Sequence, residues 1–344
     1  MRTRRLLSAL VLLLGLTVSA AAQFQAQKKG TGPISRNGPK GASQKLDLSP
    51  FSAGEAVVQR WRVGMIVTGG SGPCRGIVAT TSVPTDWPKQ QVRVVAEDLS
   101  PGVRVAYRMV DGAVKEMTAR IPALGAGEQA SAVVTFEVKR NGQRPPDDTG
   151  VYVLPNVRKS DDKLRPYLDP SPYIESTSPR VKALADEIGV DKQKAWDRVE
   201  AIHDWIRENI ELVDNRGRGV KTTLETLQDG TGDCDEFTSL FVAICRAGGI
   251  PARTVRVPGH CYGEFYLEDD QAQGHWFACD ATRAEPFGEL SDPRPVLQKG
   301  DNLLLRDPAT KRMKRYPFLP DNLTVADHRG TPPQVRIVLE LVAE

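Results

Sequence analysis

The sequence predicts an α+β protein in which an N-terminal β-sandwich precedes a second domain of helices and an antiparallel sheet. Short segments rich in valine and threonine, separated by turn residues, fill residues 55–140. Such spacing is typical of a β-sandwich. Apolar residues then recur at helical spacing over residues 179–247, and three strand-like segments follow over residues 254–279. Helices followed by neighbouring strands indicate an α+β domain.

The first 22 residues have the composition of a signal peptide. Arg2, Arg4 and Arg5 give a positive start, an apolar run over residues 6–18 follows, and residues 19–22 are small. The run is too short to span roughly 30 Å of hydrocarbon comfortably. We therefore expect a secreted or periplasmic protein. An uncleaved anchor or a lipid attachment is the alternative, although no cysteine follows the apolar run.

The chain has 344 residues, which is enough for two domains, and a formal net charge of +3. Removal of the signal peptide takes away three arginines and no acids, which leaves a neutral protein. A nucleic-acid partner usually requires a basic face, so we expect none. Residues 23–50 are rich in Gln, Lys, Gly, Ser and Pro, and we interpret them as a flexible spacer.

The β-sandwich is expected over residues 51–144. Turn signals such as Ser100-Pro101-Gly102 and Asn141-Gly142 separate its strands. The predicted strands are residues 57–67, 76–83, 92–96, 103–110, 114–121 and 130–138. We find no catalytic cluster in this part and interpret it as a structural or partner-facing module. Residues 145–177 contain several prolines and form a predicted linker.

The second domain is expected over residues 178–285. Its first helix begins at Ser178-Pro179, a cap followed by proline, and ends at Gly189. A third helix begins near Cys234 and stops at Gly248-Gly249. The second helix has an apolar face of Ala195, Val199, Ile202, Ile206 and Ile210. The predicted strands are residues 254–257, 261–267 and 276–279, and residues 286–344 form an extension with a closing strand at 335–342.

Cys234 is the candidate nucleophile. The turn residues Thr231-Gly232-Asp233 precede it and a helix follows, so its thiol lies at a helix N-terminus. Free N–H groups and the helix dipole favour a thiolate there and can hold an oxyanion. The neighbouring acids Asp233, Asp235 and Glu236 would raise the pKa of the thiol, so a histidinium partner would matter more. The alternative is a buried structural cysteine beside the apolar face of the helix.

His260 and Asp280 are the candidate partners of that thiol. A hairpin centred near Asp270 would place them directly opposite each other on one face of the sheet. A carboxylate beside an imidazole fixes its tautomer and stabilises the imidazolium ion. The alternative is a plain cross-strand polar pair. His203, on the second helix, is interpreted as a structural or surface histidine.

Five cysteines leave at least one thiol unpaired, and they are Cys74, Cys234, Cys245, Cys261 and Cys279. The same hairpin register would place Cys261 opposite Cys279, which predicts a disulfide between them. Together with His260 and His275, these two cysteines have the ligand types of a zinc site. However, their spacing matches no common zinc motif, and adjacent residues of a strand point to opposite faces. We also find no loop resembling an EF-hand, so we expect no metal and no other cofactor.

Residues 170–282 resemble the transglutaminase-like superfamily, a branch of the papain-like thiol enzymes. The order of several short motifs carries the resemblance. They are Pro170-Ser171-Pro172, the helix Ala201–Ile210 ending in Asn209-Ile210, Thr223–Leu227, Gly232-Asp233-Cys234, the turn Gly248-Gly249-Ile250-Pro251-Ala252-Arg253, Gly259-His260, and Asp280-Ala281-Thr282. The family often has proline after the aspartate, where this chain has Ala281.

The resemblance implies a catalytic triad with Cys234 as nucleophile, His260 as acid and base, and Asp280 as the residue that orients it. It implies a papain-like fold and acyl transfer or hydrolysis at a peptide or carboxamide bond, as in cysteine proteases, amidases and protein-glutamine acyltransferases. The expected partner is a protein or peptide substrate. The alternative is an inactive member that binds peptides or cell-wall material on the same fold.

Overall fold

The computed structural model describes residues 54–157, 163–214, 219–307 and 310–342. The expected signal peptide and spacer, residues 1–22 and 23–50, lie outside these ranges. Within the described ranges, no helix combines the length and the apolar character needed to cross a membrane.

The six strands predicted for the sandwich are confirmed. They are β1 (Ala56–Thr68), β2 (Cys74–Val83), β3 (Gln90–Leu99), β4 (Arg104–Val110), β5 (Val114–Leu124) and β6 (Gln129–Asn141). Along β5 and β6, buried residues alternate for much of the length with more exposed ones, because neighbouring residues of a strand face opposite sides. Trp61, Met65, Met117 and Phe136 are at most 1% exposed and lie in the core between the sheets.

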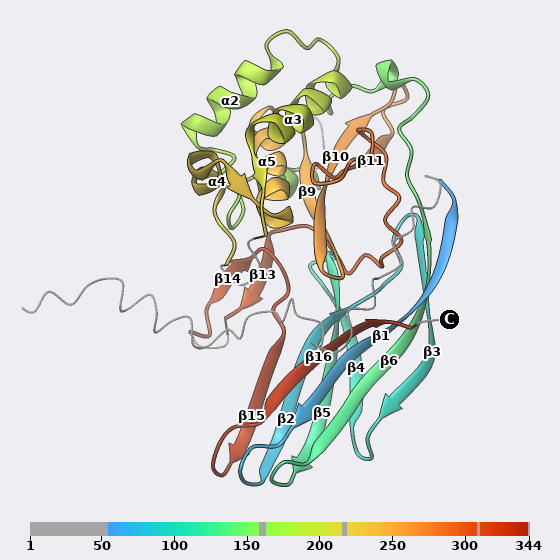
Figure 1. The fold of residues 1–344 in the computed structure, drawn as a ribbon, viewed down its shortest axis with the longest axis vertical. Coiled ribbons are helices and arrows are strands. Elements are labelled where there is room, and N and C mark those ends of the chain that lie inside the picture. The colour runs from blue at the N-terminus through green and yellow to red at the C-terminus, as the bar shows by residue number, and fades with distance from the viewer. Residues whose placement is uncertain (1–53, 158–162, 215–218, 308–309, 343–344) are drawn as a thin grey trace, which may run out of the picture. The chain divides into compact units, whose positions relative to one another are not determined.

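Two strands from the C-terminal part of the chain complete these sheets (Figure 1). β16 (Gln334–Leu341) pairs with β1, which confirms the predicted closing strand, and gives a four-stranded sheet of order β16-β1-β6-β3. β15 (Asn322–His328) pairs with β2. The sequence pattern did not predict β15, nor the hairpin of β13 (Leu303–Arg306) and β14 (Met313–Tyr316).

The predicted helices are confirmed as α2 (Pro179–Gly189), α3 (Ala195–Asn209) and α5 (Cys234–Ala247). A further helix, α4 (Thr223–Asp229), was not predicted. Its signal was present in the sequence, because Thr222 and Glu225 form a capping box at its N-terminus. The predicted linker region contains two single 3₁₀ turns, Thr149–Val151 and Arg165–Tyr167. Short parallel strands β7 (Glu211–Leu212) and β8 (Thr231–Gly232) flank α4.

Three strands pair beside α5: β9 (Ala252–Val257), β10 (His260–Glu268) and β11 (Gly274–Cys279). The short strand β12 (Gln298–Lys299) pairs with both β9 and β5, so one eight-stranded sheet runs from β11 through to β15, with β4 paired to β5. This continuity was not visible in the sequence. The mixture of helices and antiparallel sheet agrees with the predicted α+β class.

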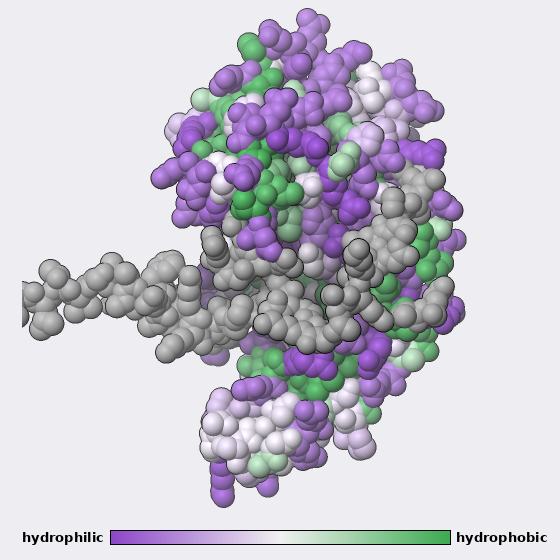
Figure 2. Space-filling model, in the orientation of Figure 1, coloured by the Kyte–Doolittle hydropathy of each residue, from purple (hydrophilic) through white to green (hydrophobic). Residues whose placement is uncertain are grey.

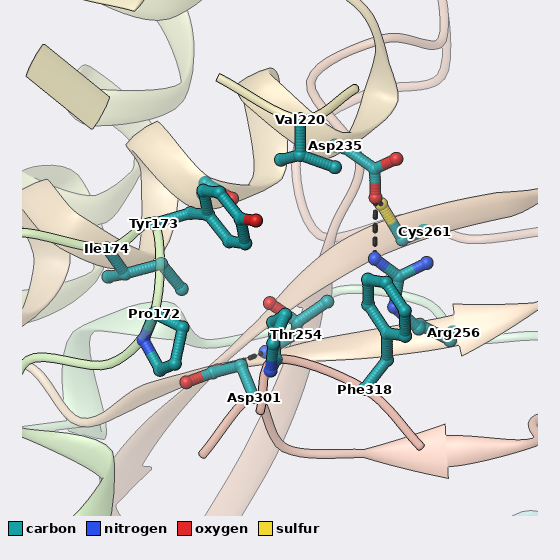
Figure 3. A pocket seen from close by; sticks show the side chains of 12 residues that line it. Pro172, Tyr173, Ile174, Val220, Asp235, Thr254, Arg256, Cys261, Asp301 and Phe318 are labelled. Atoms are coloured by element: carbon teal, nitrogen blue, oxygen red, sulfur yellow. Dashed lines mark hydrogen bonds and ion pairs between the residues drawn. The ribbon is translucent and has the colours of Figure 1, made fainter. Parts of the chain in front are cut away.

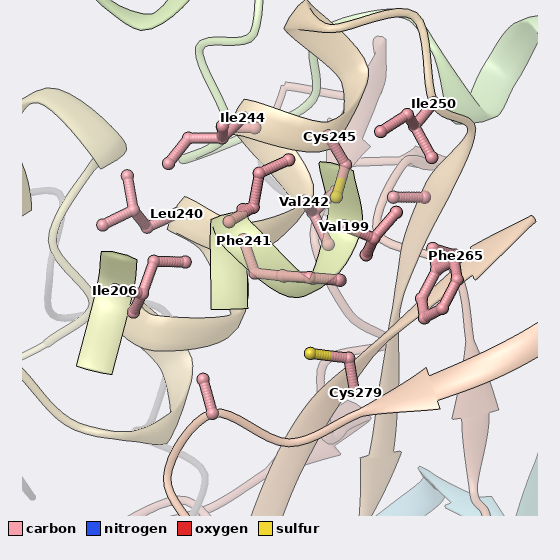
Figure 4. Close-up of a cluster of buried hydrophobic side chains, with 14 of the residues drawn as sticks. Val199, Ile206, Leu240, Phe241, Val242, Ile244, Cys245, Ile250, Phe265 and Cys279 are labelled. Carbon is pink, nitrogen blue, oxygen red and sulfur yellow. The ribbon is translucent and has the colours of Figure 1, made fainter. Parts of the chain in front are cut away.

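Helix α5 forms the centre of the second core (Figure 4). Twelve of its residues are buried, and Phe241 and Ile244 pack with Ile206 of α3 and Phe265 of β10. The helix packs tightly on β10 at Gly263, where a Cβ atom would lie 2.5 Å from Phe241 Cδ1. The sulfur atoms of Cys245 and Cys279 point into this core, so their burial is apolar packing.

The predicted register of the β10–β11 hairpin is wrong by two residues. Gly263, not Cys261, lies opposite Cys279. The turn is centred one residue later than predicted, because the Asp269 carboxylate accepts hydrogen bonds from the backbone N–H groups of Gln271 and Gln273, and Ala272 adopts φ +58°. The predicted Cys261–Cys279 disulfide is therefore also wrong, and all five cysteines are free thiols.

A buried ion pair ties α5 to the segment that follows β12. The Arg246 guanidinium donates two hydrogen bonds to the Asp301 carboxylate, at 2.8 and 2.9 Å, and both side chains are at most 2% exposed. The same carboxylate accepts from the backbone N–H of Thr254 and from the Ser171 hydroxyl. An ion pair that is buried away from water is stable only when its polar atoms are hydrogen-bonded to this degree.

The visible outer surface of the helices is mainly hydrophilic (Figure 2).

Candidate active site

Cys234 is the first residue of α5, and the preceding residues fix the start of the helix. The Asp233 carboxylate accepts from the N–H of Asp235 at 2.9 Å, and the Glu236 carboxylate accepts from the N–H of Asp233 at 2.8 Å. This is a capping box. Gly232 is required beside it, because a Cβ there would lie 2.5 Å from Glu236 Cβ. The thiol is thus held at a helix N-terminus, as the sequence predicts.

His260 is positioned by the tight turn between β9 and β10. Val257 pairs with His260 across a two-residue loop of Pro258 and Gly259, and Gly259 has φ +69°. Proline followed by a glycine with positive φ is the signature of a type II turn. The turn places the histidine at the start of β10, at the same end of the sheet as the first turn of α5.

Asp280 directly follows β11, and its carboxylate holds His260. The distance from His260 Nε2 to Asp280 Oδ2 is 2.6 Å. The second oxygen, Oδ1, accepts from the N–H and the hydroxyl of Thr282, at 3.1 and 2.7 Å. The contact between the two side chains agrees with the prediction, but they do not lie directly opposite each other in the ladder, which ends at Cys279. Thr282 is a supporting residue whose part in the site the sequence did not reveal.

Hydrogen bonds to Cys234 set its charge. The hydrogen bond from Cys261 has the largest effect, and that from His260 also contributes; against the opposing effect of burial, they lower the pKa of the Cys234 thiol to about 4. Burial lowers the pKa of His260, but hydrogen bonds to Asp280 and Cys234 outweigh it and raise that pKa to about 9. With Nε2 bonded to Asp280, the contact with Cys234 is left to Nδ1. A thiolate beside an imidazolium ion is the result at neutral pH.

The neighbouring acids have other partners, which removes the expected conflict. Asp233 and Glu236 cap the helix, and Asp235 pairs with Arg256 at 2.7 Å. Cys261 is the second residue of the site that the sequence did not reveal. Its sulfur lies 3.2 Å from the carbonyl oxygen of Cys234. The sequence had instead predicted that Cys261 lies opposite Cys279 in the hairpin.

A pocket lies beside the N-terminal turns of α5 (Figure 3). The Asp235–Arg256 ion pair and the sulfur of Cys261 form one wall, and the ring of Phe318 lies 4.4 Å from the Arg256 guanidinium carbon. The opposite wall is largely apolar and consists of Pro172, Tyr173, Ile174 and Val220. Cys261 lines this pocket, whereas Cys234 does not.

The other histidines lie outside the site. His203 is buried, with Nδ1 2.8 Å from Asp204 Oδ1, and it packs against Phe287. His275 pairs with Asp269 at 2.7 Å in the β10–β11 turn. Among the residues that the structure describes, the ligand atoms close enough to share a metal ion belong to Asp233, Cys234 and Asp235. The four residues considered for zinc are not brought together.

The charges predict a specific pH dependence for the thiol. A depressed pKa means that the thiolate persists as pH falls and is lost only near pH 4, while the imidazolium ion is lost near pH 9. We therefore expect the rate of Cys234 alkylation by iodoacetamide to rise near pH 4 and to stay nearly constant until about pH 9. Subtracting the rate for Cys234→Ala isolates this thiol. A midpoint near the free-thiol value of about 8.5 would contradict the expectation.

Comparisons with known proteins place this region in a family. Residues 182–281 match the family model of the transglutaminase-like superfamily. The uncharacterised protein YebA of Bacillus subtilis is 30% identical over 125 residues, which are 35% of this chain and 17% of YebA. An uncharacterised protein of Haemophilus influenzae is 35% identical over 96 residues, 27% of this chain and 26% of that protein. The matched regions thus span about a quarter or less of either relative.

A solved structure resembles a larger part of the chain. The crystal structure of a proposed cysteine protease from Cytophaga hutchinsonii has a TM-score of 0.53 and 19% identity, and the match covers 84% of this chain and 94% of that one. At this identity the likeness concerns the fold. The family match over residues 182–281, from α2 to just beyond β11, shows that this chain carries a domain of the transglutaminase-like superfamily.

Proposed function

We propose that the chain is an exported thiol enzyme that carries out acyl transfer or hydrolysis at peptide or carboxamide bonds. The observation that supports this most strongly is the arrangement of three side chains from separate elements. His260 Nε2 lies 2.6 Å from Asp280, and the same imidazole hydrogen-bonds to Cys234 at the N-terminus of α5. A nucleophile, a base and a residue that orients the base are the three parts of a catalytic triad for nucleophilic acyl transfer.

The reaction would proceed in two steps. The Cys234 thiolate attacks the carbonyl carbon, and the oxyanion that forms is stabilised by the backbone N–H of Cys234 and by the positive end of the α5 dipole. His260 gives its proton to the departing amine, which leaves an acyl thioester on Cys234. The neutral imidazole then takes a proton from water or from an acceptor amine as that molecule attacks the thioester. Asp280, held by Thr282, keeps His260 in the correct tautomer and orientation throughout.

Export is proposed from the composition of residues 1–22. The substrate is proposed to be a protein or a peptide, since the chain is neutral once those residues are removed and lacks the charge excess that would favour a polyanion.

The choice of acceptor decides between the two outcomes of the thioester. We expect the mature chain to release ammonia or an amine from a glutamine-containing peptide library in a Cys234-dependent manner. Adding a labelled primary amine then separates hydrolase from transferase: release without incorporation indicates hydrolysis, and incorporation indicates transfer. The Cys234→Ala variant is the control. A folded wild type that gives neither release nor incorporation, yet binds peptides, would favour the inactive binding module instead.

A further inference from the structure

A second thiol touches the proposed nucleophile. Cys261 lies on β10 and faces the first turns of α5, where its sulfur is 3.2 Å from the carbonyl oxygen of Cys234. It is also 3.3 Å from Asp235 Oδ1 and 3.6 Å from Thr238 Oγ1. Cys261 is 1% exposed, whereas Cys234 is partly exposed. The interaction between the two thiols is also the largest cause of the lowered pKa of Cys234 and of the raised pKa of Cys261.

From this contact we infer that Cys234 and Cys261 form a reversible disulfide when the protein meets a hydroperoxide, and that this bond switches the enzyme off. The inference rests on the proposed function in so far as Cys234 is the reactive thiolate. It names a modification site with one reactive and one resolving cysteine. Because the bond would consume the nucleophile itself, the oxidised protein would have no acyl-transfer activity.

The chemistry needs a hydroperoxide and no other reactant. The Cys234 thiolate attacks one peroxide oxygen, the O–O bond breaks, and the leaving alkoxide or hydroxide takes a proton from the His260 imidazolium ion. Cys234 is then a sulfenic acid. The sulfur of Cys261 attacks the sulfur of Cys234, the S–O bond breaks, and the departing hydroxide takes the thiol proton of Cys261 to form water. Two thiols and a hydroperoxide thus give a disulfide, an alcohol or water, and water.

The different environments of the two sulfur atoms assign their roles. Only the thiolate form reacts readily with peroxide, and Cys234 has the lowered pKa and the exposure that this requires. The pKa of Cys261 is raised by its hydrogen bond to Cys234 and by burial. Cys261 therefore stays a thiol until a sulfenic acid forms next to it. An adjacent resolving thiol also protects a nucleophile from further, irreversible oxidation.

The remaining cysteines do not compete for this pairing. Cys279 lies opposite Gly263, and both Cys279 and Cys245 point into the apolar core around α5. Cys74 belongs to the core between the two sheets, far along the chain in β2. Closing the Cys234–Cys261 bond joins the start of α5 to the start of β10, two elements that are already in contact. Disulfide geometry demands such preformed proximity.

The test uses the mature chain, reduced and freed of reductant, then treated with hydrogen peroxide. We expect native alkylation of Cys234 and any acyl-transfer activity to fall to the level of Cys234→Ala, and dithiothreitol to restore both. Peptide mapping without reduction should show a linked pair of peptides containing Cys234 and Cys261, two hydrogens lighter than the sum of the two. The Cys261→Ser variant keeps a small hydroxyl donor, and its loss of reactivity should become irreversible as Cys234 is oxidised to a sulfinic acid.

The matched control is Cys279→Ala, which removes the other candidate partner of Cys261 and should behave like the wild type. Oxidised wild type that has lost its reactivity without any Cys234–Cys261 peptide would overturn the inference, and this measurement needs no variant. Failure of the proposed function appears separately, as a reduced Cys234 that alkylates like an ordinary thiol, and the peptide map still decides on the disulfide.

Discussion

Replacement of His260 by alanine is expected to reduce acyl-transfer activity by about 10²–10⁴-fold, the usual contribution of a positioned acid and base. The same change should raise the pKa of Cys234 from its present value of about 4, because one of its two side-chain hydrogen bonds and the nearby positive charge are lost. The alkylation rate at neutral pH should then fall as well. The shift is expected to be partial, since the hydrogen bond from Cys261 remains.

The chain contains a suitable control for this substitution. His275 also pairs with a carboxylate, Asp269, at a similar distance of 2.7 Å, but it lies near the start of β11, beside the hairpin turn and at the other end of the strand from Asp280. We expect His275→Ala to leave both the pH profile of alkylation and the activity close to those of the wild type. If His260→Ala alkylates with the wild-type pH profile, the thiolate does not depend on His260, and the proposed mechanism is wrong.

Asp301→Ala should cause a large loss of stability although it alters none of the three triad side chains. It leaves the Arg246 guanidinium, which is 1% exposed, without its partner, and it also removes the acceptor for Thr254 N–H and the Ser171 hydroxyl. Loss of one partner from a buried pair typically costs about 3–5 kcal/mol. We therefore expect a clear fall in the urea midpoint, followed by tryptophan fluorescence, with little change in the slope of the transition.

Two further substitutions serve as comparisons for Asp301→Ala. Asp301→Asn keeps the shape but removes the charge and replaces one of the two acceptor oxygens by an amide donor, so it should lose part of the stability that Asp301→Ala loses. Asp98→Ala breaks the exposed pair with Arg62, in which the Asp98 side chain is 65% exposed, and should have little measurable effect. Equal midpoints for Asp301→Ala and Asp98→Ala would mean that the buried pair does not stabilise α5 against the sheet.

Local patterns in the sequence predicted most of the elements. Alternating residues, helical periodicity and turn signals such as Ser100-Pro101-Gly102 are properties of neighbouring residues, and they placed β1 to β6, α2, α3 and α5 correctly. The short helix α4 was missed because its seven residues give too little periodicity, although its capping box was readable. Propensity and periodicity need longer segments to be informative.

Features that depend on distant residues were less predictable. The hairpin register depends on how Asp269 closes a five-residue loop. A small error in the predicted loop led us to pair Cys261 with Cys279, whereas in the structure it contacts Cys234. The His260–Asp280 contact survived that error, because a shift of two residues keeps every side chain on the same face. The pairing of β12 with β5, and of β15 with β2, joins segments whose own sequences carry no mark of their partners.

The pairing of β16 with β1 has a consequence for the order in which the protein folds. Arg62 and Glu340 bond side by side in this sheet although 278 positions separate them in the chain. During synthesis from the N-terminus, β1 must wait for nearly the whole chain before that edge is covered, whereas the contacts of α5 with β9 and β10 are available much earlier. Pairings of such high contact order form slowly. An exposed β1 edge is therefore the point at which a chaperone would be most useful, and at which incompletely made chains would associate.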